Sequence, residues 1–175
     1  MRNSPIQLLL DEHTIISSLE DVIKSIKNNW KNDTDKYKKD VSNILIFLRE
    51  YSDHFHHFKE DKVLFPEIKN HPDFIYQEIV EGLEQHHELF RENHAKTTKA
   101  LAENKYEEVQ KILESNMNDL LDHIAVENDE LFMMAETLFK ENELERIYFK
   151  FKDIDMELGI DNKNNLANSI KKIPD

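Results

Sequence analysis

The chain of 175 residues contains no cysteine and only 2 glycines. The absence of cysteine excludes disulfides, thiolate metal sites, iron–sulfur clusters and cysteine nucleophiles. Average glycine usage of about 7% would give roughly a dozen glycines, and two are too few for phosphate-binding loops or a series of hairpin turns. The composition therefore favours long helices over sheets.

Positive charge is also scarce, because 23 Lys and Arg stand against 36 Asp and Glu, giving a formal net charge of −13. Nucleic acids and anionic membranes require a basic protein face, so neither is expected as a partner. No stretch approaches the roughly 18 consecutive apolar residues of a membrane span. The short apolar run at residues 6–10 includes Gln7 and lacks the features of a signal peptide. We therefore expect a cytoplasmic protein.

Breaks in the helical pattern divide the chain into four long segments and one shorter segment. They cover about residues 4–30, 35–69, 72–102, 106–139 and 143–158. Ser4-Pro5 has the features of a helix start, and Gly159 those of a helix end. Four helices joined by short links bury their apolar stripes by packing antiparallel.

The sequence thus predicts an all-α protein, an up-down-up-down four-helix bundle with a short C-terminal extra helix. The bundle is expected over residues 1–140, and the C-terminal helix and tail over residues 141–175. From Ile160 onward the tail is rich in Asn and Lys, which predicts partial disorder.

Nine histidines are the most unusual count in the composition. Residues 56–65 (HHFKEDKVLF) and 123–132 (HIAVENDELF) share His, Glu, Leu and Phe at the same places. A His and a Glu four residues apart lie on one helix face and can reach the same metal ion. The aligned pairs are His56 with Glu60 and His123 with Glu127.

A competing pair, His57 with Asp61, has no counterpart in the second segment, where Ile124 and Asn128 stand. This difference favours His56 and Glu60 as the inward pair. His57 and His54 are then expected at the surface or behind the ligands.

The first and third segments each place a histidine in line with an apolar stripe. Leu9 precedes His13 by four residues, and Leu83 precedes His87 by four. His86 is the competing candidate on the third segment and is not excluded by the pattern.

In an up-down bundle, all these candidates fall into one layer about 10 Å thick along the helix axes. Buried polar side chains without partners cost about 1–3 kcal/mol each, so the layer needs something to satisfy it. Metal ions do so directly, and nitrogen and oxygen ligands without sulfur suit iron or manganese, with zinc as a further candidate. The candidate ligands are His13, His56, Glu60, His87, His123 and Glu127.

The chain resembles the hemerythrin-like (HHE cation-binding) family of non-haem di-iron four-helix bundles over about residues 6–140. The features that carry the resemblance are DEH at 11–13, HHFKEDKVLFP at 56–66, QHHELFR at 85–91 and HIAVENDELF at 123–132. Ferritin-like carboxylate bundles fit less well, because they require two Glu-x-x-His motifs and only Glu84 with His87 provides one.

The resemblance implies two iron ions, bridged by an oxo or hydroxo group and by Glu60 and Glu127. His13 and His56 would hold one iron, and His87 and His123 the other. Manganese and zinc are secondary candidates.

By the same resemblance, the protein would bind O₂, NO or peroxide in sensing, carriage, detoxification or iron-cluster repair. Oxygen-carrying members have a further histidine four residues after the first on the third helix, where this chain has Arg91, or Phe90 if His86 is the ligand. The alternatives are an iron donor or oxidase enzyme and a metal-free helical protein-interaction module. The sequence does not indicate the oligomeric state.

Overall fold

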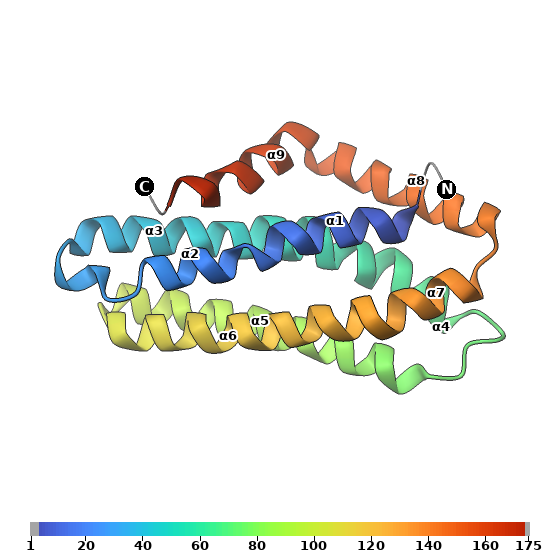
Figure 1. The fold of residues 1–175 in the computed structure, drawn as a ribbon, viewed down its shortest axis with the longest axis horizontal. Coiled ribbons are helices and arrows are strands. Elements are labelled where there is room, and N and C mark those ends of the chain that lie inside the picture. Colours follow the sequence, from blue (N-terminus) through green and yellow to red (C-terminus); the bar gives the residue numbers. More distant parts are fainter. Residues whose placement is uncertain (1–3, 174–175) are drawn as a thin grey trace.

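The computed structural model describes residues 4–173, which form helices and no strand. Helix accounts for 88% of the structure, which confirms the all-α prediction. Long helices lie side by side along the longest axis, and two C-terminal helices cover one side of them (Figure 1). Among residues 4–173, no helix combines the length and the hydropathy that crossing a bilayer requires.

The first segment consists of α1 (Pro5–Ser17), α2 (Leu19–Ser25) and a short 3-10 turn, η1 (Asn29–Lys31). Its start agrees with the prediction, because the Ser4 side chain accepts a hydrogen bond of 3.1 Å from the backbone N–H of Gln7.

The second and fourth segments contain π-helical stretches. The second runs through α3 (Thr34–Phe47), π-helical η2 (Leu48–His57), π-helical η3 (Glu60–Leu64) and α4 (Phe65–Lys69). The fourth runs through α6 (Tyr106–Val126), π-helical η4 (Glu127–Leu131) and α7 (Phe132–Leu138). Hydrogen bonds from i to i+5 widen these turns, and such stretches occur frequently at functional sites.

The third segment, α5 (Gln77–Ala102), begins at Gln77 rather than at the predicted Pro72. The preceding helix, α4, has already ended at Lys69, and Pro72 disfavours the α conformation at His71 before it. The chain then stays non-helical through Tyr76 while the Phe74 side chain packs into the core.

The C-terminal part forms α8 (Glu141–Leu158), α9 (Ile160–Ser169) and a 3-10 turn, η5 (Ile170–Lys172). Gly159 separates α8 from α9 with a φ of 93°, as its predicted place at a helix end requires. The prediction of a partly disordered tail was wrong for the described residues up to 173. Leu166, Ile170 and Ile173 recur at helical spacing and are buried in the main core.

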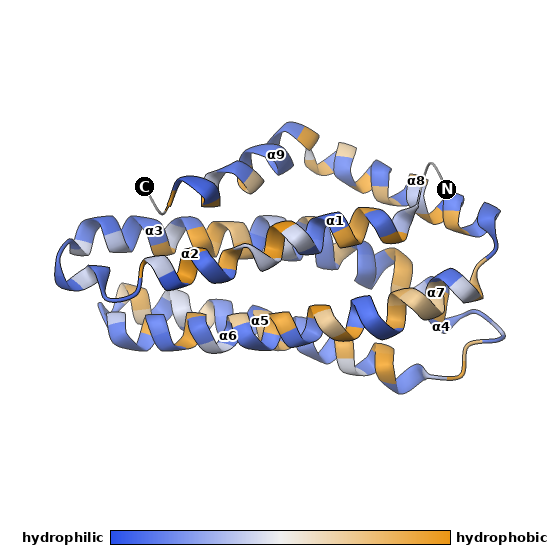
Figure 2. Cartoon of the chain, in the orientation of Figure 1, coloured by the Kyte–Doolittle hydropathy of each residue, from blue (hydrophilic) through white to orange (hydrophobic). Residues whose placement is uncertain are grey.

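Two apolar cores fill the molecule, and the predicted metal-binding residues lie between them. On α1, Leu9 belongs to one core and Ile16 to the other, with His13 between them. On α5, Leu83 and Phe90 flank the predicted layer in the same way. Figure 2 shows these apolar stripes interrupted by polar residues along the helices.

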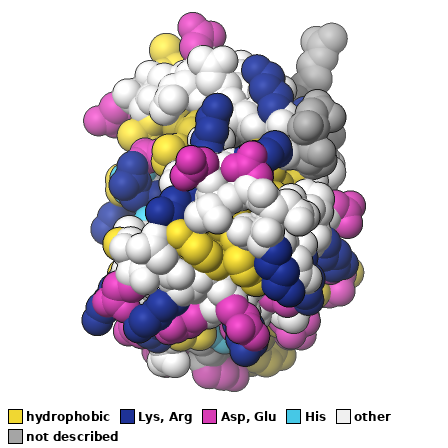
Figure 3. All heavy atoms as spheres, turned by 90° about the vertical axis from the view of Figure 1, so that its left-hand side faces the viewer, with side chains coloured by type: hydrophobic (Ala, Val, Ile, Leu, Met, Phe, Trp, Pro, Cys, Tyr) yellow, Lys and Arg dark blue, Asp and Glu magenta, His cyan; other side chains and the backbone are white. Residues whose placement is uncertain are grey.

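The end of the molecule that carries the turns between α2 and α3 and between α5 and α6 presents both signs of charge. Lys and Arg side chains are interspersed there with Asp and Glu around a small apolar patch (Figure 3). A mixed surface of this kind gives no concentrated field of one sign on the visible face.

Candidate metal centre

The structure brings all six predicted residues together in one buried layer. None of the six is more than 2% exposed, although they come from six different elements. Those elements are α1, η2, η3, α5, α6 and η4. The members of the layer are His13, His56, Glu60, His87, His123 and Glu127.

The two glutamates divide their oxygens between histidines on opposite sides of the layer. Glu60 Oε1 lies 3.5 Å from His56 Nε2, and Glu60 Oε2 lies 3.5 Å from His87 Nε2. Glu127 Oε2 lies 3.2 Å from His13 Nε2, and Glu127 Oε1 lies 3.3 Å from His123 Nε2. Each carboxylate is therefore placed to serve two neighbouring positions.

Two groups of potential ligand atoms result, each with all its atoms within 4.8 Å of one another. The first group contains His13, His56, Glu60 and Glu127. The second group contains His57, Glu60, His87 and His123. Glu60 belongs to both groups, so the two positions are adjacent.

Many of these buried atoms have no hydrogen-bond partner. They include Nε2 of His13 and of His56 and all four carboxylate oxygens of Glu60 and Glu127. Orphaned buried polar groups of this kind cost free energy, and charged ones cost more. Cations coordinated by these atoms would satisfy them, so the donor set fits a metal centre.

The pKa values indicate the same chemistry. Burial and the neighbouring charge of Glu127 raise the pKa of Glu60 well above its usual value, so the pair resists carrying two negative charges without a counter-charge. Burial and the charge of His13 lower the pKa of His56 to about 4, which keeps the imidazole neutral. Neutral imidazole is the form that coordinates metals.

Outer contacts orient three of the histidine rings. His13 Nδ1 lies 2.7 Å from Asn128 Oδ1. His56 Nδ1 lies 2.9 Å from Glu12 Oε2, and His87 Nδ1 lies 2.7 Å from Asp61 Oδ1. In each case the side-chain oxygen accepts the Nδ1–H hydrogen bond, which leaves the Nε2 lone pair facing the layer. Such contacts are typical of metal-binding histidines.

The sequence placed His57 at the surface or behind the ligands, and the structure buries it beside the layer. Its side chain is buried and stacks on His87 with 4.0 Å between the ring centroids. Its Nδ1 faces Asp53 Oδ1 at 3.4 Å, and its Nε2 has no hydrogen-bond partner. Burial followed by the charge of His87 lowers the pKa of His57 well below its usual value. Both His56 and His57 lie on the π-helical stretch η2 and are buried, whereas of the adjacent histidines on α5 only His87 is buried.

The other candidates on the third segment and nearby are less buried. His86 is exposed while His87 is fully buried, so the geometry favours His87 over its competitor. His54 is half exposed and contacts Glu50 at 3.0 Å, as expected for a surface histidine.

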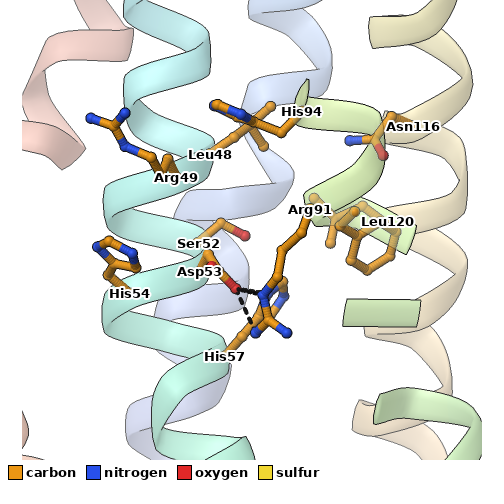
Figure 4. Close-up of a pocket in the computed structure, with 11 residues that line it drawn as sticks. Leu48, Arg49, Ser52, Asp53, His54, His57, Arg91, His94, Asn116 and Leu120 are labelled. Atoms are coloured by element: carbon orange, nitrogen blue, oxygen red, sulfur yellow. Dashed lines mark hydrogen bonds and ion pairs between the residues drawn. The ribbon is translucent and has the colours of Figure 1, made fainter. Parts of the chain in front are cut away.

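A cavity of about 270 Å³ reaches the layer at His57. Figure 4 shows Arg91 beside it, bonded to Asp53, with Ser52 and Leu120 also on its wall. The Arg91 guanidinium also donates to Asp61 at 2.8 Å, so the cavity wall is connected to the residue that orients His87.

Comparison with known proteins agrees with this arrangement. A family model described as the hemerythrin HHE cation-binding domain matches residues 4–135. No curated protein and no solved structure matches the chain significantly. The match covers most of the chain and every residue of the buried layer, and the clustered His and Glu side chains are compatible with metal binding. The chain therefore belongs to the hemerythrin HHE cation-binding domain family.

Proposed function

We propose that the chain holds two adjacent metal ions in the buried layer, with iron as the first candidate. Through them it binds a small molecule such as O₂, NO or peroxide. We also propose that residues 1–140 form an up-down-up-down four-helix bundle and that residues 141–175 are a C-terminal addition to it. Short connections and the lengthwise packing of α5 on α6 support this arrangement (Figure 1).

One observation carries the proposal: both Glu60 and Glu127 direct their two oxygens at histidines on different sides. A carboxylate that coordinates a single ion would need to face the histidines on only one side of the layer. Two carboxylates that are both divided in this way are suited to bridging a pair of ions.

The ligand sets follow from these contacts. His13 and His56, with one oxygen from each glutamate, would hold one ion. His87 and His123, with the remaining oxygens, would hold the other. His57 borders the second set and would give it a third nitrogen donor, so the two positions differ in chemistry.

Iron bound by nitrogen and oxygen ligands supplies reversible coordination of small molecules and exchange of electrons. The protein's own residues provide the surroundings. Phe65 stacks on His87 and Phe132 on His13, which excludes water from two sides of the layer. The cavity at His57 leaves one side accessible.

The same site could bind a small molecule reversibly, convert it, or release iron. These functions differ in whether the small molecule is released unchanged, the small molecule is consumed, or the iron leaves the protein. Absorption that recovers after O₂ is removed, without consumption of O₂, supports binding alone. A metal-free interaction module is disfavoured by the orphaned carboxylate oxygens of Glu60 and Glu127. Such a module would also melt at the same temperature with and without a chelator.

The test is to load the purified protein with Fe(II) without oxygen, remove free metal and count the bound ions. We expect two ions per chain, and loss of both in Glu60→Gln and Glu127→Gln. The exposed neighbour Glu130→Gln, on the same π-helical stretch, is the matched control and should retain both ions. Wild-type protein without iron, or Glu60→Gln with two ions, would overturn the proposal.

A further inference from the structure

Four charged side chains form a closed, buried ring behind His56. Two are acids and two are lysines, so their formal charges cancel. Lys59 is 0% exposed and Lys163 is 9% exposed, which is rare for lysine. The members of the ring are Glu12, Lys59, Asp155 and Lys163.

Glu12 connects the ring to the metal-binding layer. Its Oε2 accepts the hydrogen bond from His56 Nδ1 at 2.9 Å, while its Oε1 accepts from both lysines, at 2.7 Å from Lys59. Asp155 closes the ring, because its two oxygens lie 2.7 Å from Lys59 Nζ and 2.8 Å from Lys163 Nζ. Both oxygens of Glu12 are thus held in place, one by the histidine and one by the lysines.

Half of the ring comes from the C-terminal helix pair, α8 and α9. Asp155 lies on α8 and Lys163 on α9, beyond the residues that match the family, 4–135. Figure 1 shows α8 and α9 following one another, with a bend between them, along the side of the molecule formed by α1 and α3; α8 contacts α1, and α9 contacts α3 and η2. Residues outside the family domain are therefore connected, through Glu12, to the predicted ligand His56.

Stability alone does not account for the ring. Removing four charges from water carries a large desolvation penalty, and well-packed apolar residues often stabilise such positions better. The C-terminal helix pair already has apolar anchors in Phe151 on α8 and Leu166 on α9, which are buried. A buried charged ring is instead suited to holding one carboxylate in a fixed orientation.

We infer that Lys163 and Asp155 are positioning residues of the metal centre, which act by holding Glu12 against His56. This inference rests on the proposed two-ion function. By fixing Nδ1–H of His56 toward Glu12, the ring keeps Nε2 directed at the ion shared with His13. Docking of the C-terminal helix pair and metal binding on that side of the layer are consequently linked.

Replacing Lys163 by Met keeps the length of the side chain and removes its charge. The variant leaves two carboxylates with Lys59 as their sole buried cation, so Glu12 loses part of its restraint. We expect binding of the ion on the His13 and His56 side to weaken by about 10–100-fold. The ion on the His87 and His123 side should be unaffected, so tight stoichiometry falls from two to one in a chelator competition.

Lys36→Met is the matched control. Lys36 Nζ also contacts the C-terminal part, at 3.4 Å from the carbonyl oxygen of Ile173, but it pairs with Asp40 and does not touch Glu12. If Lys36→Met weakens metal binding as much as Lys163→Met, the effect is a general loosening of the tail and the inference is wrong.

A second variant, Glu12→Gln, tests the route of the effect and keeps the inference falsifiable if Lys163→Met does not fold. Glu12→Gln should lose the same ion, and adding Lys163→Met to it should weaken binding no further. A further loss in the double variant, or two tight ions in Glu12→Gln, would overturn the inference. Wild-type protein that binds no ion would instead refute the proposed function.

Discussion

Asn128 accepts a hydrogen bond from Nδ1 of His13 at 2.7 Å, and Asp61 stands in the same relation to His87 at 2.7 Å. Asn128 and Asp61 occupy equivalent places in the two similar segments, one residue after Glu127 and Glu60. Each half of the layer thus supplies the group that orients a histidine of the other half. The similarity between the two segments therefore includes the predicted ligands and also Asp61 and Asn128, which orient histidine rings.

This correspondence predicts that the two supports affect different ions. Asp61→Ala should weaken the ion on the His87 side by about 10–100-fold, because the ring loses the acceptor that fixes its orientation. Asn128→Ala should weaken the ion on the His13 side by a similar factor. Chelator competition on each variant measures both effects, and the exposed Asp129→Ala is the control. Equal loss of both ions in both variants would contradict the prediction.

His57 is predicted to be a ligand of the second ion. His57→Phe keeps a ring of similar shape stacked on His87 but removes both nitrogens. The iron-loaded variant should show a changed absorption spectrum and weaker binding of one ion. His54→Phe, three residues earlier and half exposed, should leave both unchanged. An unchanged spectrum in His57→Phe would exclude a ligand role.

The choice between adjacent histidines on α5 is tested by a pair of variants. His87→Ala should lose metal, because His87 is buried and its Nε2 faces Glu60. His86→Ala should retain both ions, since His86 is exposed. Full metal occupancy in His87→Ala, measured by elemental analysis, would reverse the assignment.

Order in the C-terminal part is predicted to contribute to stability. Ile170 is fully buried in the main core, so Ile170→Ala should lower the free energy of unfolding by about 2–5 kcal/mol. Met156→Ala, at a position 72% exposed, should change it by less than about 0.5 kcal/mol. Denaturant unfolding of the metal-free proteins measures the free energy of unfolding of both variants. Equally small changes in the two would mean that the tail does not pack in solution.

The helical class and the buried layer could be predicted because their signals are local. Periodic apolar residues define each helix, and the spacing from His56 to Glu60 recurs from His123 to Glu127. The role of Asn128 was missed because its mismatch with Asp61 was taken as a difference, although both side chains accept hydrogen bonds. Two hydrogen-bond acceptors at equivalent positions could have predicted that Asp61 and Asn128 orient histidine rings.

Other features depend on geometry that the residue pattern does not encode. The burial of His57 beside His56 depends on how the whole layer packs around the π-helical stretch η2, whereas the prediction assumed α-helical spacing. The contact between Lys163 and Glu12 joins residues at opposite ends of the sequence. The order of the tail was predictable in principle, because Leu166, Ile170 and Ile173 already form a helical stripe.

The most direct test of the central claim is anomalous diffraction from crystals of the iron-loaded protein, recorded on both sides of the iron absorption edge. We expect two anomalous peaks per chain, both lying between the carboxylates of Glu60 and Glu127 and flanked by the histidines of the layer. A single peak, no peak, or peaks bound elsewhere on the acidic surface would contradict it.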